Sequence, residues 1–276
     1  MQHYLIYQAN TLDEIYECSY SLLRYLTVYN VKPPKDHSVV IYTSQPALLE
    51  NYSAFFYNFE LRDVQEKATT RFGLLKNFFK EHDGNVLFLE TNTYCIDQLD
   101  RIFSDISKGT AYVLGWNQVL RRNKGVSDNL KKIVVDGGEY TFSTDELNRW
   151  NDNVIGLRSS YKNLVEEIVQ QSEQAPDLSK PIAEKWLFHH KLQKLNVRTA
   201  EEAITQYDDL KEFRDLLRKF FTKYQEESVP NQLKLIHHLD AALIQKQKKE
   251  FQNLPLHQKL LKRITGKHWS IEKYKV

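Results

Sequence analysis

The sequence predicts an α/β fold, a mostly parallel sheet flanked by helices, followed by a helical C-terminal extension. Three observations predict it. Strand-like and helix-like segments alternate over the first ninety residues. The strand-like segments are continuous apolar runs, which is typical of strands covered on both faces. The later part of the chain is helical in pattern, and 276 residues suffice for one large domain with a small appendage.

The first strand and helix are predicted at the N-terminus. His3–Gln8 (HYLIYQ) reads as a short buried strand. Thr11 then begins a helix, because its hydroxyl can cap the free amides while Glu14, three residues on, completes a capping box. Five residues at helical spacing are expected to face the sheet: Ile15, Ser19, Leu22, Leu23 and Leu26.

Two further strands and a helix complete the alternating pattern. The strands are predicted at Ser38–Thr43 (SVVIYT) and Asn85–Glu90 (NVLFLE). The helix between them is predicted at about Gln65–Glu81. Parallel sheets bind ligands outside the carboxyl ends of their strands. Functional residues are therefore expected just after Gln8, Thr43 and Glu90.

The rest of the chain is predicted from weaker patterns. Strands are expected at 110–117 and 154–157, a hairpin at 131–143, and helices at about 159–172, 181–194, 209–225 and 231–250. The predicted domain organisation is an α/β domain over residues 1–225 and a helical, basic extension over residues 226–276.

Positive charge is concentrated at the C-terminal end. From Lys246 to Val276 the chain carries nine Lys or Arg residues against two Glu, a net charge of +7, whereas the whole chain has +2. Leu254–Val276 also contains apolar and aromatic residues. An anionic membrane surface is one predicted partner of this segment, and a solvated helix is the alternative. Nucleic acid is disfavoured, since no recognised binding module accompanies the charge.

Several classes of protein are disfavoured by what the sequence lacks. It has no Gly-rich phosphate loop, no Cys or His spacing suited to structural zinc, and no serine-hydrolase elbow. Two cysteines are too few for a disulfide framework. No signal peptide is readable, and no apolar run approaches the ~20 residues of a spanning helix, so a cytoplasmic protein is expected, with peripheral attachment at the inner membrane face.

Six segments, in order, resemble glycosyltransferases with the nucleotide-diphospho-sugar (GT-A) fold. The clearest is Asn85–Asp97 (NVLFLETNTYCID), which resembles an apolar strand ending in an Asp-x-Asp motif. The others are Ile6–Asn10, Arg71 within TTRFGLLKNFF, Trp150–Gly156 (WNDNVIG), Ile182–His190 (IAEKWLFHH) and Ile204–Leu210 (ITQYDDL). Together they cover residues 3–225. The resemblance implies a GT-A-like (Rossmann-like) fold that binds a nucleotide-diphosphate sugar.

The resemblance also implies roles for individual residues. Gln8 and Asn10 would lie at the opening nucleotide-binding turn. Arg71 and Glu90 would contact the diphosphate, and Asn92 the ribose. Two residues would act on the sugar: Asn151 and Glu184. Asp152 would lie near the sugar, and Lys185 stands where the family usually has Gln. Trp116 and Trp150 could stack on a sugar or base, or pack in the core.

The metal-binding part of the family motif is altered. The two Asp positions are Glu90 and Asn92, and a late His position is Gln206. Mn²⁺ and Mg²⁺ prefer anionic oxygen ligands, whereas amide oxygens carry no net charge. Any divalent site built from Glu90, Asn92 and Gln206 is therefore expected to be weak.

These observations predict a nucleotide-sugar-dependent glycosyltransferase acting on a glycan or glycolipid. The rival hypothesis is a catalytically inactive relative that binds a sugar nucleotide or a protein partner, which the changes at Asn92 and Gln206 favour. A third is an interaction module whose working surface is the basic tail.

Overall fold

The computed structural model describes residues 1–64, 70–115, 132–135, 138–141, 152–174, 180–206, 211–224, 229–253 and 255–256. The chain divides into two compact units, Met1–Asp208 and Asp209–Val276. The predicted boundary after residue 225 falls inside the second unit. This unit contains helices α7 (Lys211–Tyr224) and α8 (Val229–Gln252). In the described ranges, no helix combines the length and the apolar character needed to cross a membrane.

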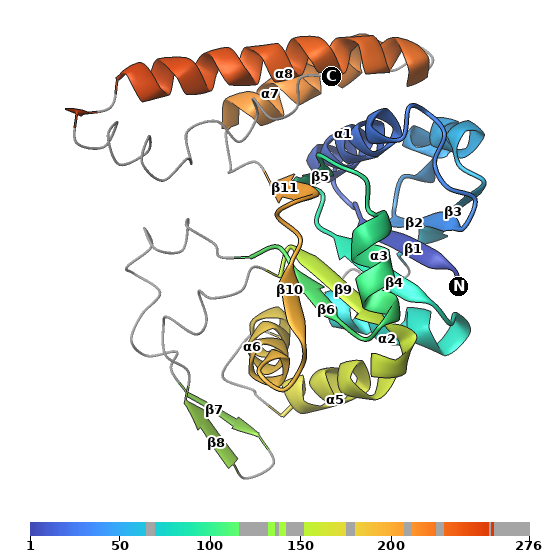
Figure 1. The fold of residues 1–276 in the computed structure, drawn as a ribbon, viewed down its shortest axis with the longest axis vertical. Coiled ribbons are helices and arrows are strands. Elements are labelled where there is room, and N and C mark those ends of the chain that lie inside the picture. The colour runs from blue at the N-terminus through green and yellow to red at the C-terminus, as the bar shows by residue number, and fades with distance from the viewer. Residues whose placement is uncertain are drawn as a thin grey trace. The chain divides into compact units, whose positions relative to one another are not determined.

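A seven-stranded sheet forms the centre of the first unit (Figure 1). Its order is β10-β6-β9-β4-β1-β2-β3, and all neighbours are parallel except those of β9, which runs antiparallel to both β4 and β6. The predicted α/β class with a mostly parallel sheet is confirmed. In chain order the strands are β1 (His3–Gln8), β2 (His37–Thr43), β3 (Asn58–Asp63), β4 (Asn85–Leu89), β6 (Ala111–Val113), β9 (Val154–Arg158) and β10 (Val197–Thr199).

Two smaller sheets accompany the central one. β5 (Thr93–Cys95) pairs antiparallel with β11 (Ile204–Gln206), which brings the segment after β4 beside the end of the first unit. β7 (Lys132–Val135) and β8 (Gly138–Thr141) form the hairpin that the Asp-Gly-Gly sequence predicts.

Helices cover both faces of the central sheet. α2 (Arg71–Glu81), α5 (Lys162–Ser172) and α6 (Lys180–Leu192) share a buried apolar cluster with residues of β1, β2, β4, β6 and β9. On the opposite face, the hydroxyl of Tyr7 in β1 lies 3.0 Å from the hydroxyl of Ser21 in α1 (Leu12–Val28). α3 (Asp100–Ser107) packs beside β4 and β9. Short 3₁₀ helices lie at Pro46–Leu48, Glu50–Phe55 and Ser159–Tyr161.

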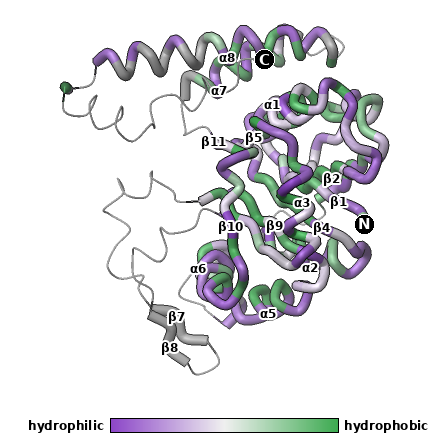
Figure 2. Tube along the Cα trace, in the orientation of Figure 1, coloured by the Kyte–Doolittle hydropathy of each residue, from purple (hydrophilic) through white to green (hydrophobic). Residues whose placement is uncertain are grey.

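The sequence pattern of the central strands explains this two-sided cover. β4 is buried at every position, and β9 at all but its last residue. Figure 2 shows hydrophobic residues following one another along β4 and β9, whereas hydrophilic and hydrophobic residues alternate along α1. A strand that is apolar on both faces is stable only when both faces are covered.

Some predicted elements need correction. The helix predicted from residue 65 begins at Arg71, because Thr70 has an extended backbone and its hydroxyl accepts from Gly73 N. β3 and α3 were not predicted. β3 (NFELRD) carries charged side chains at the edge of the sheet, and α3 (DRIFSDIS) is a short amphipathic helix with three buried apolar residues.

The predicted capping box at the start of α1 is confirmed. Thr11 Oγ1 accepts from Glu14 N at 3.2 Å, and Glu14 Oε2 accepts from Thr11 N at 2.9 Å. All five residues expected on the inner face of this helix are buried: Ile15, Ser19, Leu22, Leu23 and Leu26. The cap therefore fixes the start of the helix that follows the first strand.

Replacing the cap residue tests this assignment. We expect Thr11→Ala to lower the free energy of unfolding by about 1 kcal/mol, because an orphan helix amide loses its acceptor. Thr27→Ala, in the same helix but bonded to Leu23 O, is the matched control and should change stability by less than about 0.5 kcal/mol. Equal losses for the two variants in urea titrations would contradict the capping role.

Candidate functional site

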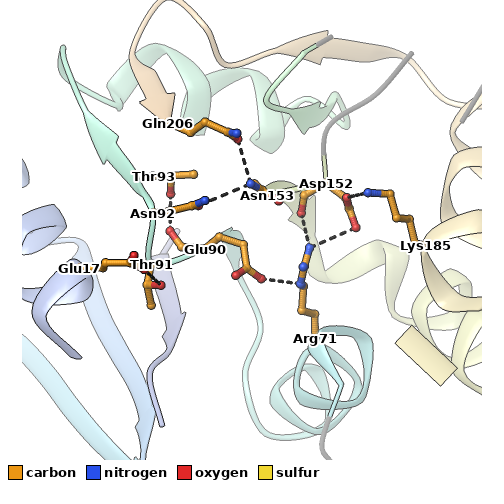
Figure 3. Close-up of polar contacts among 10 residues, drawn as sticks. All are labelled: Glu17, Arg71, Glu90, Thr91, Asn92, Thr93, Asp152, Asn153, Lys185 and Gln206. Atoms are coloured by element: carbon orange, nitrogen blue, oxygen red, sulfur yellow. Dashed lines mark hydrogen bonds and ion pairs between the residues drawn. The ribbon is translucent and has the colours of Figure 1, made fainter. Parts of the chain in front are cut away.

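The segment that follows β4 presents alternate side chains to opposite sides. Thr91 points toward α1, where its hydroxyl donates to Glu17 Oε2 at 2.7 Å, while Glu90 and Asn92 flank it (Figure 3). A tight turn fixes the backbone, since both Thr93 N and Thr93 Oγ1 donate to Glu90 O. The two predicted motif residues are thus held at the carboxyl end of a central strand.

The antiparallel strand β9 brings a second segment to the same place. Its first residue, Val154, pairs with Leu89, so the residues before β9 lie beside those after β4. Glu90 N donates to Asn153 O at 2.8 Å, which continues the ladder by one bond. Asp152 and Asn153 therefore sit opposite the altered motif because of strand register.

Arg71 joins these two segments. Its Nε lies 2.5 Å from Glu90 Oε1, and its Nη1 donates to Asp152 Oδ2 at 3.1 Å and to Asp152 O at 2.9 Å (Figure 3). Arg71 is the first residue of α2, which packs on the sheet through Phe72, Leu75 and Phe78. Helix packing thus places the guanidinium group over the end of β4.

Asp152 is the buried centre of the arrangement. Its side chain is 5% exposed, and its second oxygen, Oδ1, lies 2.7 Å from Lys185 Nζ of α6. Burial alone would raise the pKa of Asp152, but the positive charges of Arg71 and Lys185 outweigh it and hold the pKa at about 2. Asp152 is therefore an anion shared by two cations. We call Arg71, Glu90, Asp152 and Lys185 the ion cluster.

Glu90 has a different environment from Asp152. Its side chain is 30% exposed, and burial raises its pKa while Arg71 opposes the rise. The carboxylates of Asp152, Glu14 and Glu17 also raise the pKa of Glu90. Its negative charge is thus the less stabilised of the two in the cluster.

The residues at the metal positions do not suit a divalent cation. Asn153 Nδ2 donates to Gln206 Oε1 at 2.9 Å and lies 3.5 Å from Asn92 Oδ1. A hydrogen-bond donor therefore stands between two oxygens that a metal would have to bring together. Glu90, the one carboxylate, is paired with Arg71, whereas Mg²⁺ and Mn²⁺ prefer anionic oxygen ligands. Within the described ranges, no group of three His, Cys, Asp or Glu residues could hold a metal.

Glu184 is tied to the start of α2. Thr70 Oγ1 donates to Glu184 Oε1 at 2.7 Å, and the Glu184 residue is 1% exposed. Burial raises the pKa of Glu184, against the hydrogen bonds that it accepts from Thr70 and from the Phe72 backbone. Glu184 therefore contacts Thr70, which caps α2 and directly precedes Arg71 in the chain. Its predicted role on the sugar stays a prediction.

The other predicted residues are distributed as follows. Gln8 ends β1, which is parallel to β4, so Gln8 and Glu90 lie at the same edge of the sheet. Asn10 N donates to Glu14 Oε2, within the turn that starts α1. Asn151, Trp116 and Trp150 lie outside the described residues, as does Tyr207–Leu210 of the late motif.

Sequence reasoning selected residues that lie together in the structure, and their functional roles stay predictions. It selected Arg71, Glu90, Asn92 and Gln206, and the structure brings these into two adjoining contacts. It did not predict that Asp152 and Lys185 form an ion pair, or that Asn153 bonds Gln206. Asp152 is expected near the sugar and Lys185 replaces the usual Gln of the family, so the opposite charges of these two residues were the available signal for their ion pair.

No protein-family model matches the chain, and no curated protein matches it in sequence. Solved structures with a similar chain path include the galactosyltransferase LgtC, with 13% identity, 67% of this chain and 70% of that one covered, and a TM-score of 0.44. The glycosyltransferase GlyE of Streptococcus pneumoniae has 8% identity and a TM-score of 0.44. That match covers 84% of this chain but spans about half, 51%, of GlyE.

A solved structure of another kind is similar to the same degree. A putative glucose-1-phosphate thymidylyltransferase from Bacillus anthracis matches with 13% identity, coverage of 74% of this chain and 89% of that one, and a TM-score of 0.45. Similarity at this level assigns no substrate or reaction to the chain.

The shared anion can be tested by stability. We expect Asp152→Ala to lower the free energy of unfolding by about 3 kcal/mol, because it leaves Arg71 and Lys185 without their common partner. The control is Glu202→Ala, which breaks the ion pair between Glu202 (77% exposed) and Arg101 (71% exposed). This variant should lower the free energy of unfolding by less than about 1 kcal/mol. Similar losses in the two variants would show that Asp152 does not organise the cluster.

Proposed function

We propose that this chain is a glycosyltransferase that binds a nucleotide-diphosphate sugar at the carboxyl edge of β1 and β4. The observation that carries the proposal is the ion cluster, in which two cations from two helices meet at the end of a central strand. A nucleotide diphosphate gathers negative charge as the glycosidic bond breaks, and fixed positive groups stabilise that charge. The cluster supplies such groups where parallel sheets bind ligands.

The proposed roles follow from placement. Arg71 and Lys185 would donate to the diphosphate, and Glu90, paired with Arg71, would lie beside it. Asn92, next to Glu90 at the strand end, would contact the ribose. Gln8 and Asn10, beyond β1, would lie toward the base. Two residues named on resemblance, Asn151 and Glu184, would act on the sugar.

The proposed acceptor is a glycan or glycolipid. Support for a lipid-linked acceptor comes from the basic, partly apolar tail at Leu254–Val276, which would hold the protein on an anionic membrane at about 1 kcal/mol per basic residue near the surface. Nearly all of this tail lies outside the described residues.

A catalytically inactive sugar-nucleotide-binding relative is the second candidate. It is favoured by the pairing within the site, where two cations face two carboxylates and the amide oxygens of Asn92 and Gln206 both face Asn153 Nδ2. The two candidates differ in product. An enzyme releases UDP or GDP from a nucleotide sugar over time, whereas an inactive relative binds the sugar nucleotide and returns it intact.

Isothermal titration with UDP and with GDP tests nucleotide binding, each in Mn²⁺ and in EDTA. We expect one of the two to bind, and Arg71→Met to weaken that binding by at least about tenfold, because a charge-assisted donor to phosphate is lost. Arg101→Met, which removes an exposed arginine paired with Glu202, is the matched control and should bind as the unaltered chain does. If neither nucleotide binds in either condition, both candidates are wrong.

A further inference from the structure

We infer that Glu90 is an internal anion that occupies Arg71 until a phosphate group of the ligand displaces it, and that the diphosphate binds without a divalent cation. This inference rests on the proposed function and assigns Glu90 a role opposite to that of a metal ligand. In a metal site, Glu90 would help to bind the diphosphate. As an internal anion, it competes with the diphosphate.

Arg71 and Lys185 have more hydrogen-bond donors than the ion cluster uses. Arg71 uses Nε for Glu90 and Nη1 for Asp152, while its Nη2 makes no hydrogen bond or ion pair with the residues that the structure describes. Lys185 has three donors, and within the same residues one contact, to Asp152 Oδ1. The two side chains are 31% and 29% exposed. Donors on both cations therefore remain for phosphate oxygens.

The two carboxylates of the cluster differ in their exposure and in their number of ion-pair partners. Asp152 is 5% exposed and has an ion pair on each oxygen, to Arg71 and to Lys185. Glu90 is 30% exposed and, in the described part of the chain, its carboxylate has Arg71 as its one partner. Asp152 is thus the fixed anion that positions both cations, and Glu90 is the one that a ligand can replace.

The charges in the ion cluster balance one another. Two cations and two carboxylates leave the ion cluster neutral, so a diphosphate gains little while Glu90 stays on Arg71. Once the more exposed Glu90 carboxylate turns to water, the cluster presents a net positive charge to the phosphates. The planar guanidinium of an arginine can donate two hydrogen bonds to a carboxylate or to two oxygens of a phosphate, so one anion can take the place of the other.

The neighbouring amides disfavour a metal in the same role. Asn153 Nδ2 faces both Gln206 Oε1 and Asn92 Oδ1, and a cation there would meet an amide donor rather than a ligand. Glu90 points instead to Arg71 (Figure 3). The positive charge next to Glu90 therefore comes from a side chain of the protein itself.

The test is the affinity for UDP and GDP in EDTA, measured by isothermal titration on the full chain and on Glu90→Gln. We expect the nucleotide that binds the unaltered chain to bind Glu90→Gln about tenfold more tightly, because a competing ion pair has been removed. Glu90→Asp keeps the charge and should not show this gain. Glu202→Gln, which neutralises a carboxylate on the exposed Arg101, is the control and should leave the affinity unchanged.

The outcomes separate this inference from the proposed function. Nucleotide binding by the unaltered chain in EDTA, strengthened by Glu90→Gln alone, supports the inference. Binding that requires Mn²⁺, or that Glu90→Gln weakens or leaves unchanged, overturns the inference and leaves nucleotide binding in place. An equal gain in Glu90→Asp would rule out the charge explanation. No binding by any variant, in Mn²⁺ or EDTA, would remove the proposed function and the inference together.

Discussion

The candidate site depends on one buried carboxylate. Asp152 is almost fully excluded from water, yet it stays ionised because Arg71 and Lys185 each pair with one of its oxygens. A buried charge without such partners would cost several kcal/mol. The same pairing fixes two long, otherwise mobile side chains, one from α2 and one from α6. Two cationic side chains are thereby held at the end of β4 before any ligand arrives.

Strand β9 makes this arrangement possible. In a fully parallel sheet, the end of β4 would be bordered by the carboxyl end of its neighbour. Because β9 runs the other way, the turn that enters it, with Asp152 and Asn153, lies beside Glu90. The register of one antiparallel pair, Leu89 with Val154, therefore determines which side chains can meet. The packing of α2 and α6 on the same face then supplies the cations.

Much of the fold could be predicted from sequence because its signals are local. The apolar runs of β1, β2 and β4, and the capping box of α1, each depend on residues close together in the chain. β3 was not predicted because it is an edge strand with exposed charges. The start of α2 was predicted too early, since the helix begins only after its cap, Thr70. The edge position of β3 depends on strand pairing elsewhere in the chain, whereas Thr70 is a local cap that helical periodicity alone does not mark.

The sequence motifs predicted which residues would lie together at the end of β4, but not the contacts that depend on strand register. Glu90 and Asn92 follow a recognisable strand, and Arg71 and Gln206 follow from the order of the resembling segments. The bond between Asn153 and Gln206 joins residues 53 positions apart, and the pairing of Lys185 with Asp152 joins α6 to a turn before β9. Contacts of this kind require strand pairing and helix packing together, and a single sequence specifies neither.

The central claim is that protein cations, organised by Asp152, hold the diphosphate. A crystal structure of the full chain with bound UDP or GDP, grown in EDTA, tests it most directly. The account predicts phosphate oxygens within hydrogen-bond distance of Arg71 Nη2 and Lys185 Nζ, with the Glu90 carboxylate turned away and Asp152 unmoved. A nucleotide bound elsewhere, or one bound with the Arg71–Glu90 pair intact, would contradict it.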